Sequence, residues 1–346
     1  MIIHHRFARH QRGVALLIVL MVVAFVAILG TEMGMRLQLQ IQRTANIKDS
    51  NQAYWYALGA EQYARKSIKL LLEQADGVIH LNQPWSEQFL YPLDNGGIQA
   101  DLVDMQSCFN LNAVIPANGN ANANGQEQGQ STNPADVEVT PAMEAFHRLL
   151  LTQGMIPDMD SFTADTVRDS LADWLDADDN IRAFGAEDVD YESLPHPYLA
   201  ANAMMQNKSE LRMVNGVSAQ WINTLFAYVC ARPNDASMQL NVNTVSEDQA
   251  PVLAALTGLD AGRASALIAS RPQDGWQDTQ AFFSEPDIQA LQLTDAQRQW
   301  FTVTTQHFIL YTKTRYNNAT FSMSSVFYID DSEKVSVIRR EFGGRY

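Results

Sequence analysis

The chain has 346 residues, which is long enough for two or three structural units rather than one. Its 39 acidic residues against 24 Lys and Arg, a net charge of -15, argue against nucleic-acid binding, because a phosphate backbone requires a basic surface. Calcium or a basic partner suits this charge better than a polyanion does.

The N-terminal segment predicts a single membrane-spanning helix. The run from Val14 to Thr31 contains no charge, and its 18 residues rise about 27 Å as a helix, close to the hydrocarbon thickness of a bilayer. Arginines precede the run, so the positive-inside rule keeps that end in the cytoplasm. We therefore expect a single-pass protein of the inner membrane whose body, after Glu32, lies in the periplasm.

The helical pattern continues beyond the membrane segment. The sequence predicts one helix over about 15–74, because no proline interrupts it and small apolar residues recur at three- and four-residue steps. Gly30 and Gly34 are the expected flexible points, since glycine weakens a helix by about 1 kcal/mol relative to alanine. The recurring face should pack closely on a sheet; it consists of Ala53, Ala57, Ala60, Ala64, Ile68 and Leu71. We expect the half of the helix around Ala53 to Leu71 to contact partner subunits as well.

The residues around Gly13 resemble those of type IV prepilins and type II secretion pseudopilins. The resemblance rests on the basic leader "RHQRG", the apolar run "VALLIVLMVVAFVAIL" that follows it at once, and the long amphipathic continuation. It implies that a prepilin peptidase removes residues 1–13, cutting between Gly13 and Val14, and methylates the new N-terminus. Length and charge alone leave an uncleaved single-pass anchor as the alternative.

Ile18 stands where most pilin-like proteins have glutamate, the fifth residue of the mature chain. In that family the glutamate neutralises the N-terminal amine of a neighbouring subunit, and a carboxylate in lipid requires such a partner. Its absence and the large size of the chain resemble the K-type minor pseudopilin of the general secretory pathway. That resemblance implies a non-enzymatic subunit at the tip of the type II secretion pseudopilus.

The same resemblance implies what this subunit does and what it meets. A tip subunit initiates or caps assembly and aids export of folded proteins across the outer membrane. Its partners would be the I-type and J-type minor pseudopilins, with the secretin or an exported substrate as further candidates. A minor type IV pilin-like binding module, anchored in the same way, is the alternative function.

The rest of the chain predicts an α+β fold. Ile98, Ala100 and Leu102 alternate with other residues as in a strand, and "FTVTTQHFILYTKTRY", "ATFSMSSVFYID" and "KVSVIRREF" end the chain as strands. The Asn/Gly/Gln-rich stretch 115–136 should be a flexible loop. We expect a pilin-like domain, in which the long helix packs on an antiparallel sheet, at 32–114 and 301–346. A large all-α insertion with SAM-like or helix-hairpin-helix units at 137–300 interrupts it.

Two features describe the predicted insertion. "FNLNAV" from Phe109 and "LNVNTV" from Leu240 match each other as strand ends leading to a helix, the second with Thr244 and Glu247 spaced as a capping box. So short a match also arises by chance, but both segments are features of K-type proteins. The second SAM-like unit, about 244–290, contains a hairpin formed by Leu256, Gly258 and Leu259 and a packed face formed by Ala264, Leu267 and Ile268.

That hairpin predicts packing rather than DNA binding. DNA-binding versions offer backbone amides from a Gly-x-Gly turn to phosphate, with lysines nearby. Asp260 replaces the second glycine here, and the segment has no lysine. We therefore expect no nucleic-acid partner.

An acidic segment near residue 180 is the candidate metal site. Asp176, Asp178, Asn180 and Glu187 fall at positions 1, 3, 5 and 12 of an EF-hand-like spacing, where oxygens converge on Ca²⁺. Ile181 at position 6 and the lack of a second helix exclude a true EF-hand, and a solvated acidic loop is the alternative. The K-type resemblance implies structural calcium here. The candidate ligands are Asp176, Asp178, Asn180, Glu187, Asp188 and Asp190.

The remaining reactive residue types give few signals. Cys108 and Cys230 form an even pair in an exported body, so a disulfide is possible, although two buried thiols are the alternative. His147, His196 and His307 are scattered, and no G-x-S-x-G or H-E-x-x-H motif occurs. The sequence therefore predicts no enzyme.

Overall fold

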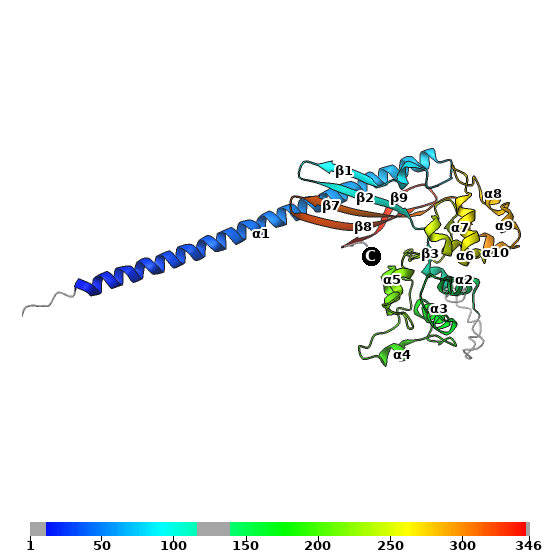
Figure 1. Ribbon diagram of the computed structural model, residues 1–346, viewed down its shortest axis with the longest axis horizontal. Coiled ribbons are helices and arrows are strands. Elements are labelled where there is room, and N and C mark those ends of the chain that lie inside the picture. Colours follow the sequence, from blue (N-terminus) through cyan, green and yellow to red (C-terminus); the bar gives the residue numbers. More distant parts are fainter. Residues whose placement is uncertain (1–11, 116–138, 344–346) are drawn as a thin grey trace, which may run out of the picture.

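The computed structural model describes residues 12–115 and 139–343, so most of the predicted flexible loop and of the leader lies outside the described residues. Helix α1 (Arg12–Gln74) is one unbroken helix of 63 residues. It continues through Gly30 and Gly34, so neither glycine interrupts it. Its first half projects from the body without contact, and this helix is long and apolar enough to cross a membrane (Figure 1).

The sheet has five antiparallel strands in the order β1-β2-β7-β8-β9. The central pairing joins β2 to β7, with Leu102 opposite Leu310, so segments on either side of the insertion complete one sheet. The predicted antiparallel sheet and its interruption are therefore confirmed. The strands are β1 (Phe89–Leu93), β2 (Gly96–Asp104), β7 (His307–Tyr316), β8 (Ala319–Ile329) and β9 (Val335–Phe342).

The second half of α1 packs on one face of this sheet. All six residues of the predicted face, Ala53 to Leu71, are at most 8% exposed, and the Thr314 hydroxyl donates to the Ala53 carbonyl at 2.7 Å. Small side chains are suited to this position because they let the helix lie close to the strands. The predicted partner contact through this half of the helix stays a prediction, and it would use the sides of α1 that the sheet leaves exposed.

A buried carboxylate fastens the edge strand β9 to the helix. Glu61 of α1 is fully buried and accepts from Arg340 Nε at 2.6 Å, from Arg340 Nη2 at 2.9 Å and from Ser325 Oγ at 2.8 Å. Burial acts to raise the pKa of Glu61, but these hydrogen bonds outweigh it and lower that pKa below its ordinary value. The charge is therefore retained and paired inside the fold.

The insertion forms two lobes between β2 and β7 (Figure 1). Its core includes Phe109, Leu111 and Val114, so it begins before the predicted residue 137. It is also not all-α, because it contains two short parallel strand pairs, β3–β4 and β5–β6.

The first lobe contains β3 (Phe109–Asn110), α2 (Pro141–Leu150), α3 (Ser161–Leu175), α4 (Asp188–Glu192), α5 (Ile222–Leu225) and β4 (Val229–Cys230). The second contains β5 (Leu240–Asn241), α6 (Ala250–Thr257), α7 (Ala261–Ala269), α8 (Thr279–Phe283), α9 (Pro286–Gln289), α10 (Asp295–Arg298) and β6 (Phe301–Thr302). Short 3-10 helices are η1 (Pro84–Ser86), η2 (Leu111–Val114), η4 (Lys208–Met213) and η5 (Glu247–Gln249).

The two matching segments, "FNLNAV" and "LNVNTV", make equivalent hydrogen bonds in the two lobes. Asn112 accepts from the Met205 backbone N–H at 2.8 Å and donates to the Met205 carbonyl at 2.9 Å. Asn243 makes the equivalent pair of bonds to Trp276, at 2.8 and 2.9 Å. Each lobe therefore uses the second Asn of the motif as a clamp on a distant backbone, and the internal similarity is structural.

The second clamp depends on Gly275. This residue has φ +70°, and a Cβ there would lie 2.6 Å from Asn243 Cγ. The expected capping box of Thr244 and Glu247 was wrong, because Ser246 and Gln249 form the box before α6. The Thr244 hydroxyl instead donates to Asp104 at 2.6 Å.

Candidate functional site

The acidic segment of the first lobe begins at the end of α3 and encloses a buried arginine. Arg182 Nη1 lies 2.8 Å from Asp176 Oδ2 and also pairs with Asp173, and all three side chains are at most 7% exposed. Gly185 allows this approach, because a Cβ there would collide with the Asp173 carboxylate. Burial raises the pKa of Asp173 to about 7 and that of Asp176 to about 6, while Arg182 acts in the opposite direction.

Glu187 closes this segment, and its carboxylate has no protein partner. The side chain is 2% exposed, and neither Oε1 nor Oε2 receives a hydrogen bond; Asp176 Oδ1 is likewise without a donor. Burial, followed by the charges of neighbouring carboxylates, raises the pKa of Glu187 to about 8. Buried carboxylate oxygens without donors are costly, and hard cations such as Ca²⁺ prefer oxygen ligands of this kind. Asp176 and Glu187 thus offer oxygens of the kind that Ca²⁺ binds, but two side chains supply only part of the roughly six to eight oxygens that this ion takes.

The other four predicted ligands are engaged in hydrogen bonds within the first lobe. Asp178 Oδ1 accepts from the Asn180 backbone and side-chain amides at 2.9 and 2.7 Å. Asp188 accepts from the Ala200 N–H at 2.9 Å, and Asp190 accepts from the Glu187 N–H at 3.1 Å. Within residues 12–115 and 139–343, no three His, Cys, Asp or Glu side chains are arranged to hold a metal. The six predicted ligands thus do not converge on one point.

Two residues of this cluster were missed from the sequence. Asp173 lies three residues before Asp176, so the two carboxylates share a helix face, and that spacing was the available signal. Arg182 occupies the centre of the expected calcium loop, where a cation is unusual. Only the tertiary structure shows that Arg182 turns inward between the two carboxylates.

The junction between the sheet and the insertion holds a second buried polar cluster. Asp104, at the end of β2, accepts from Thr244 Oγ1 at 2.6 Å, Thr305 Oγ1 at 2.5 Å and the Gln106 N–H at 2.6 Å. Burial nevertheless raises the pKa of Asp104 to about 6. These bonds connect the sheet to the second lobe.

The first lobe is joined to the same junction. Cys108 and Cys230 form a disulfide in the structure, with Cα atoms 5.8 Å apart. Arg232 Nε lies 3.1 Å from Asp235 Oδ2, and His307 Nδ1 lies 3.8 Å from the same oxygen. Burial, and then the nearby Arg232 charge, lower the pKa of His307. The residues at this junction hold the sheet and the lobe together.

The other predicted site residues are separate from both clusters. His147 of α2 lies 3.2 Å from Asp165, and His196 is exposed after α4. Gly258 ends α6 with φ +84°, and Asp260 caps α7 by accepting from the Arg263 N–H at 2.9 Å. The hairpin is thus a packing unit, and its buried residues are Leu256, Leu259, Ala264, Leu267 and Ile268. Its turn carries the carboxylate of Asp260, whereas binding of a DNA phosphate would require hydrogen-bond donors there.

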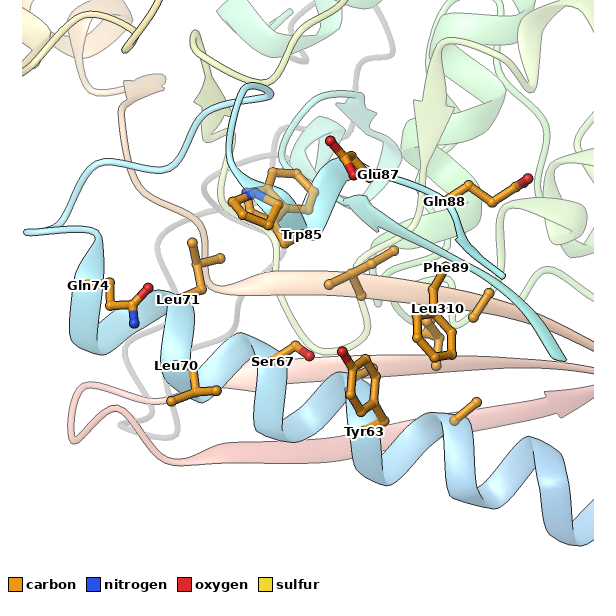
Figure 2. A pocket seen from close by; sticks show the side chains of 15 residues that line it. Tyr63, Ser67, Leu70, Leu71, Gln74, Trp85, Glu87, Gln88, Phe89 and Leu310 are labelled. Carbon is orange, nitrogen blue, oxygen red and sulfur yellow. The ribbon is translucent and has the colours of Figure 1, made fainter. Parts of the chain in front are cut away.

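A groove runs beside the second half of α1. It has a volume of about 360 Å³ and lies between α1, η1 and the strands β1, β2 and β7. Figure 2 shows Tyr63, Ser67 and Leu70 on the helix, with Phe89 and Leu310 on the strands. The Tyr63 and Phe89 rings stack with centroids 4.7 Å apart at the groove, and Trp85 lines it from η1.

Known proteins match the chain along most of its length. Two family models described as type II secretion system protein K match residues 107–234 and 240–304, which are the two lobes. A type II secretion system protein K of Aeromonas hydrophila is 38% identical over 79% of this chain and 80% of its own length. That of Klebsiella pneumoniae is 34% identical over 96% of this chain and 97% of its own length.

A solved structure shows the same architecture. It is the GspK-GspI-GspJ complex of the type 2 secretion system of enterotoxigenic Escherichia coli. The matched chain aligns with a TM-score of 0.73 and 28% identity, covering 88% of this chain and 100% of the other. The long helix, antiparallel sheet and helical insertion are therefore shared with that structure.

Proposed function

Because this chain belongs to the type II secretion system protein K family, whose members are minor pseudopilins, we propose that it occupies the tip of the pseudopilus. At the tip it initiates or caps assembly and aids export of folded proteins across the outer membrane. The observation that carries this proposal is Ile18, an exposed apolar residue of α1 where pilin-like subunits have a carboxylate. A subunit without that carboxylate cannot neutralise a neighbour's amine through the usual pair, so one copy at an end is tolerated.

The N-terminal half of α1 supports a membrane stage before assembly. Its side chains from Val14 to Thr31 are mostly exposed and apolar, so they require lipid or neighbouring helices. We propose that the helix crosses the inner membrane once and that the body lies in the periplasm. Prepilin peptidase would remove residues 1–13, leaving a methylated Val14 as the new N-terminus.

The body supports a position at the end of a filament. Both lobes of the insertion lie at one end of the sheet, away from the projecting first half of α1 (Figure 1). A helical array has a fixed rise per subunit and little lateral room, so such lobes would clash with subunits stacked above. The partners we propose are the I-type and J-type minor pseudopilins, as in the solved relative, with the secretin or an exported substrate beyond the tip.

Calcium is a structural part of this proposal. Asp176 and Glu187 would hold the ion through the carboxylate oxygens that have no donor, whereas Asp178, Asn180, Asp188 and Asp190 are engaged in other hydrogen bonds of the same segment. A bound Ca²⁺ supplies positive charge to a cluster of buried carboxylates. The ion would thereby stabilise the first lobe rather than take part in a reaction.

End-labelling of pseudopili tests the tip position. A tag on an exposed loop of the full chain, detected by immunogold on sheared filaments, should mark one end of each filament. Labels repeated along the shaft would contradict the proposal. An Ile18→Glu variant is the informative companion, since a restored carboxylate should permit some incorporation below the tip.

A further inference from the structure

The first lobe exposes a pair of aromatic side chains beside the start of α3. Phe162 is 68% exposed and Phe184 is 39% exposed. Their rings meet edge to face, with centroids 5.8 Å apart. Burial of an aromatic side chain is favourable, so two adjacent rings that stay in water indicate a contact surface rather than a requirement of the fold.

The backbone around these rings is fixed by hydrogen bonds. The loop after Arg182 runs back along α3, because the Arg182 N–H donates to Asp173 Oδ2 and the Phe184 N–H donates to Asp169 Oδ2, each at 3.2 Å. These bonds carry Phe184 toward the N-terminal half of the helix, where Phe162 lies. The pair is therefore held in place before any partner binds, which lowers the entropic cost of binding.

Exposed carboxylates border the pair. Two of them lie in the segment that leads into α3, and a third lies in the loop that leads to Phe184. Ile181 adds an apolar side chain that is 37% exposed. We call this set the aromatic face; it consists of Asp158, Asp160, Phe162, Asp179, Ile181 and Phe184.

No exposed Lys or Arg from the same stretch of chain balances these carboxylates. Residues 151–207, all of which the structure describes, contain only Arg168 and Arg182. Each is 7% exposed and pairs with aspartates of the same segment. The aromatic face is therefore apolar at its centre and negative at its border.

The cations of the neighbouring elements are engaged elsewhere. On α2, which packs against α3, Arg148 Nε donates to the Ala255 carbonyl at 2.9 Å. On η4, Lys208 and Arg212 lie 5.6 and 4.5 Å from the centroid of the Phe226 ring. The first lobe thus already holds cations beside one phenylalanine ring, while the rings of the aromatic face have none from these elements.

Charge and position narrow the choice of occupant. A second copy of the aromatic face would bring carboxylates against carboxylates, and nucleic acid or anionic lipid would be repelled in the same way. A basic protein segment meets no such repulsion. Arginine fits best, because its planar guanidinium can stack on an aromatic ring and donate to carboxylates at the same time. Figure 1 shows α3 and α4 on the side of the first lobe away from the sheet, where a second protein can approach.

We propose that the aromatic face binds an arginine-bearing basic segment of a second periplasmic protein. The guanidinium lies over the Phe162 ring, and the carboxylates of Asp158 and Asp160 pair with it and with the cations beside it. The inference rests on the proposed function, because that function supplies the candidate partners beyond the tip. It adds which surface of this chain meets them and what charge selects them.

Binding measurements on the full chain in detergent, with calcium present, test the rings. The probes are a purified exported protein and the periplasmic domain of the secretin, both of the same secretion system. Phe162→Ala should weaken binding of one probe at least about tenfold, whereas Phe162→Tyr keeps the ring and should stay within about threefold. The matched control is Phe342→Ala, at a 61% exposed phenylalanine of β9, which should stay within about twofold of the wild type.

A double variant, Asp158→Asn with Asp160→Asn, tests the charge. Asparagine at position 160 keeps the cap of α3, because its side-chain oxygen can accept from the Thr163 N–H as Asp160 does. Asparagine also tolerates the φ of +57° at position 158. The double variant should bind about tenfold more weakly, with a smaller salt dependence. Asp331→Asn with Glu333→Gln removes the same charge from the exposed β8–β9 turn and should change neither.

Stability separates a lost interface from a lost fold. The substituted side chains are exposed, so each variant should keep the melting temperature of the wild type. If the wild type binds a probe and both Phe162→Ala and the double aspartate variant bind it equally well, the inference is overturned and the proposed function stands. If the wild type binds neither probe, the inference is likewise overturned, whereas the tip position is decided separately by the end-labelling of pseudopili.

Discussion

At the residue scale, the two partners of the Glu61–Arg340 ion pair differ in burial. Glu61 is fully buried, whereas the Arg340 side chain is 42% exposed. Removing the arginine leaves a buried charge with Ser325 and Gln62 as its remaining donors, and loss of one partner of a buried pair costs about 3–5 kcal/mol. We expect Arg340→Met to lower the melting temperature clearly. Arg315→Met, at an exposed arginine of the same sheet, is the control; equal losses in the two variants would refute the argument.

His307 makes a second prediction at this scale, concerning pH. Burial and Arg232 lower the pKa of His307 below its ordinary 6.5, so the folded state takes up a proton less readily than the unfolded state. The stabilising contribution of neutral His307 is present above pH 6.5 and is lost as the pH falls through the lower folded pKa. Compared with His307→Gln, the wild type should lose its advantage in melting temperature on acidification from pH 7 to 4.

Asp104 gives stability the opposite pH dependence, so its contribution must be separated from that of His307. Its folded pKa is raised to about 6, so its contribution to stability is present below about pH 3.8 and is lost as the pH rises through 6. Because Asp104 is present in both the wild type and His307→Gln, its effect cancels in their difference. A difference in melting temperature that stays constant with pH would show that His307 does not titrate as described.

At the element scale, we expect the acidic segment between α3 and α4 to couple calcium binding to stability. Ligand binding stabilises the folded state by about 2.7 kcal/mol when free ion is 100 times its dissociation constant. Chelator should therefore lower the melting temperature of the wild type. Glu187→Gln should abolish that response and, in chelator, should melt above the wild type, because burial raises the pKa of Glu187 to about 8 and glutamine avoids the cost of either burying that charge or protonating it.

The exposed acid Glu192 of α4 supplies the control for calcium. Glu192→Gln removes the same charge from the same lobe, and its chelator response should match that of the wild type. An identical melt of the wild type with and without chelator would exclude a stabilising ion. A response that survives in Glu187→Gln would place the ion elsewhere.

At the scale of the whole molecule, we propose that α1 serves first as a membrane anchor and then as a filament element. On this proposal processing precedes assembly, because a charged leader would otherwise prevent the helix from packing with its neighbours. Gly13→Leu should block cleavage, so intact mass spectrometry should find a precursor longer by the 13-residue leader. A wild-type mature chain that begins anywhere other than Val14 would contradict this prediction.

The sequence by itself determined the elements whose signal is local or periodic. The continuous helix, its alanine face and the strands that end the chain follow from side-chain periodicity, which burial on one face imposes directly. The similarity of "FNLNAV" and "LNVNTV" was also visible, although the clamps on Met205 and Trp276 were not. These properties depend on residues that are close in sequence.

Where distant groups meet depends on the tertiary structure. The early start of the insertion at Phe109, the inward turn of Arg182 and the hydrogen bonds that Asp178, Asp188 and Asp190 accept from backbone N–H groups all depend on how a loop closes. Spacing along a chain limits which carboxylates can converge, but each one binds the nearest available N–H unless a stronger partner competes. For that reason the acidic composition of the site could be predicted, whereas its geometry could not.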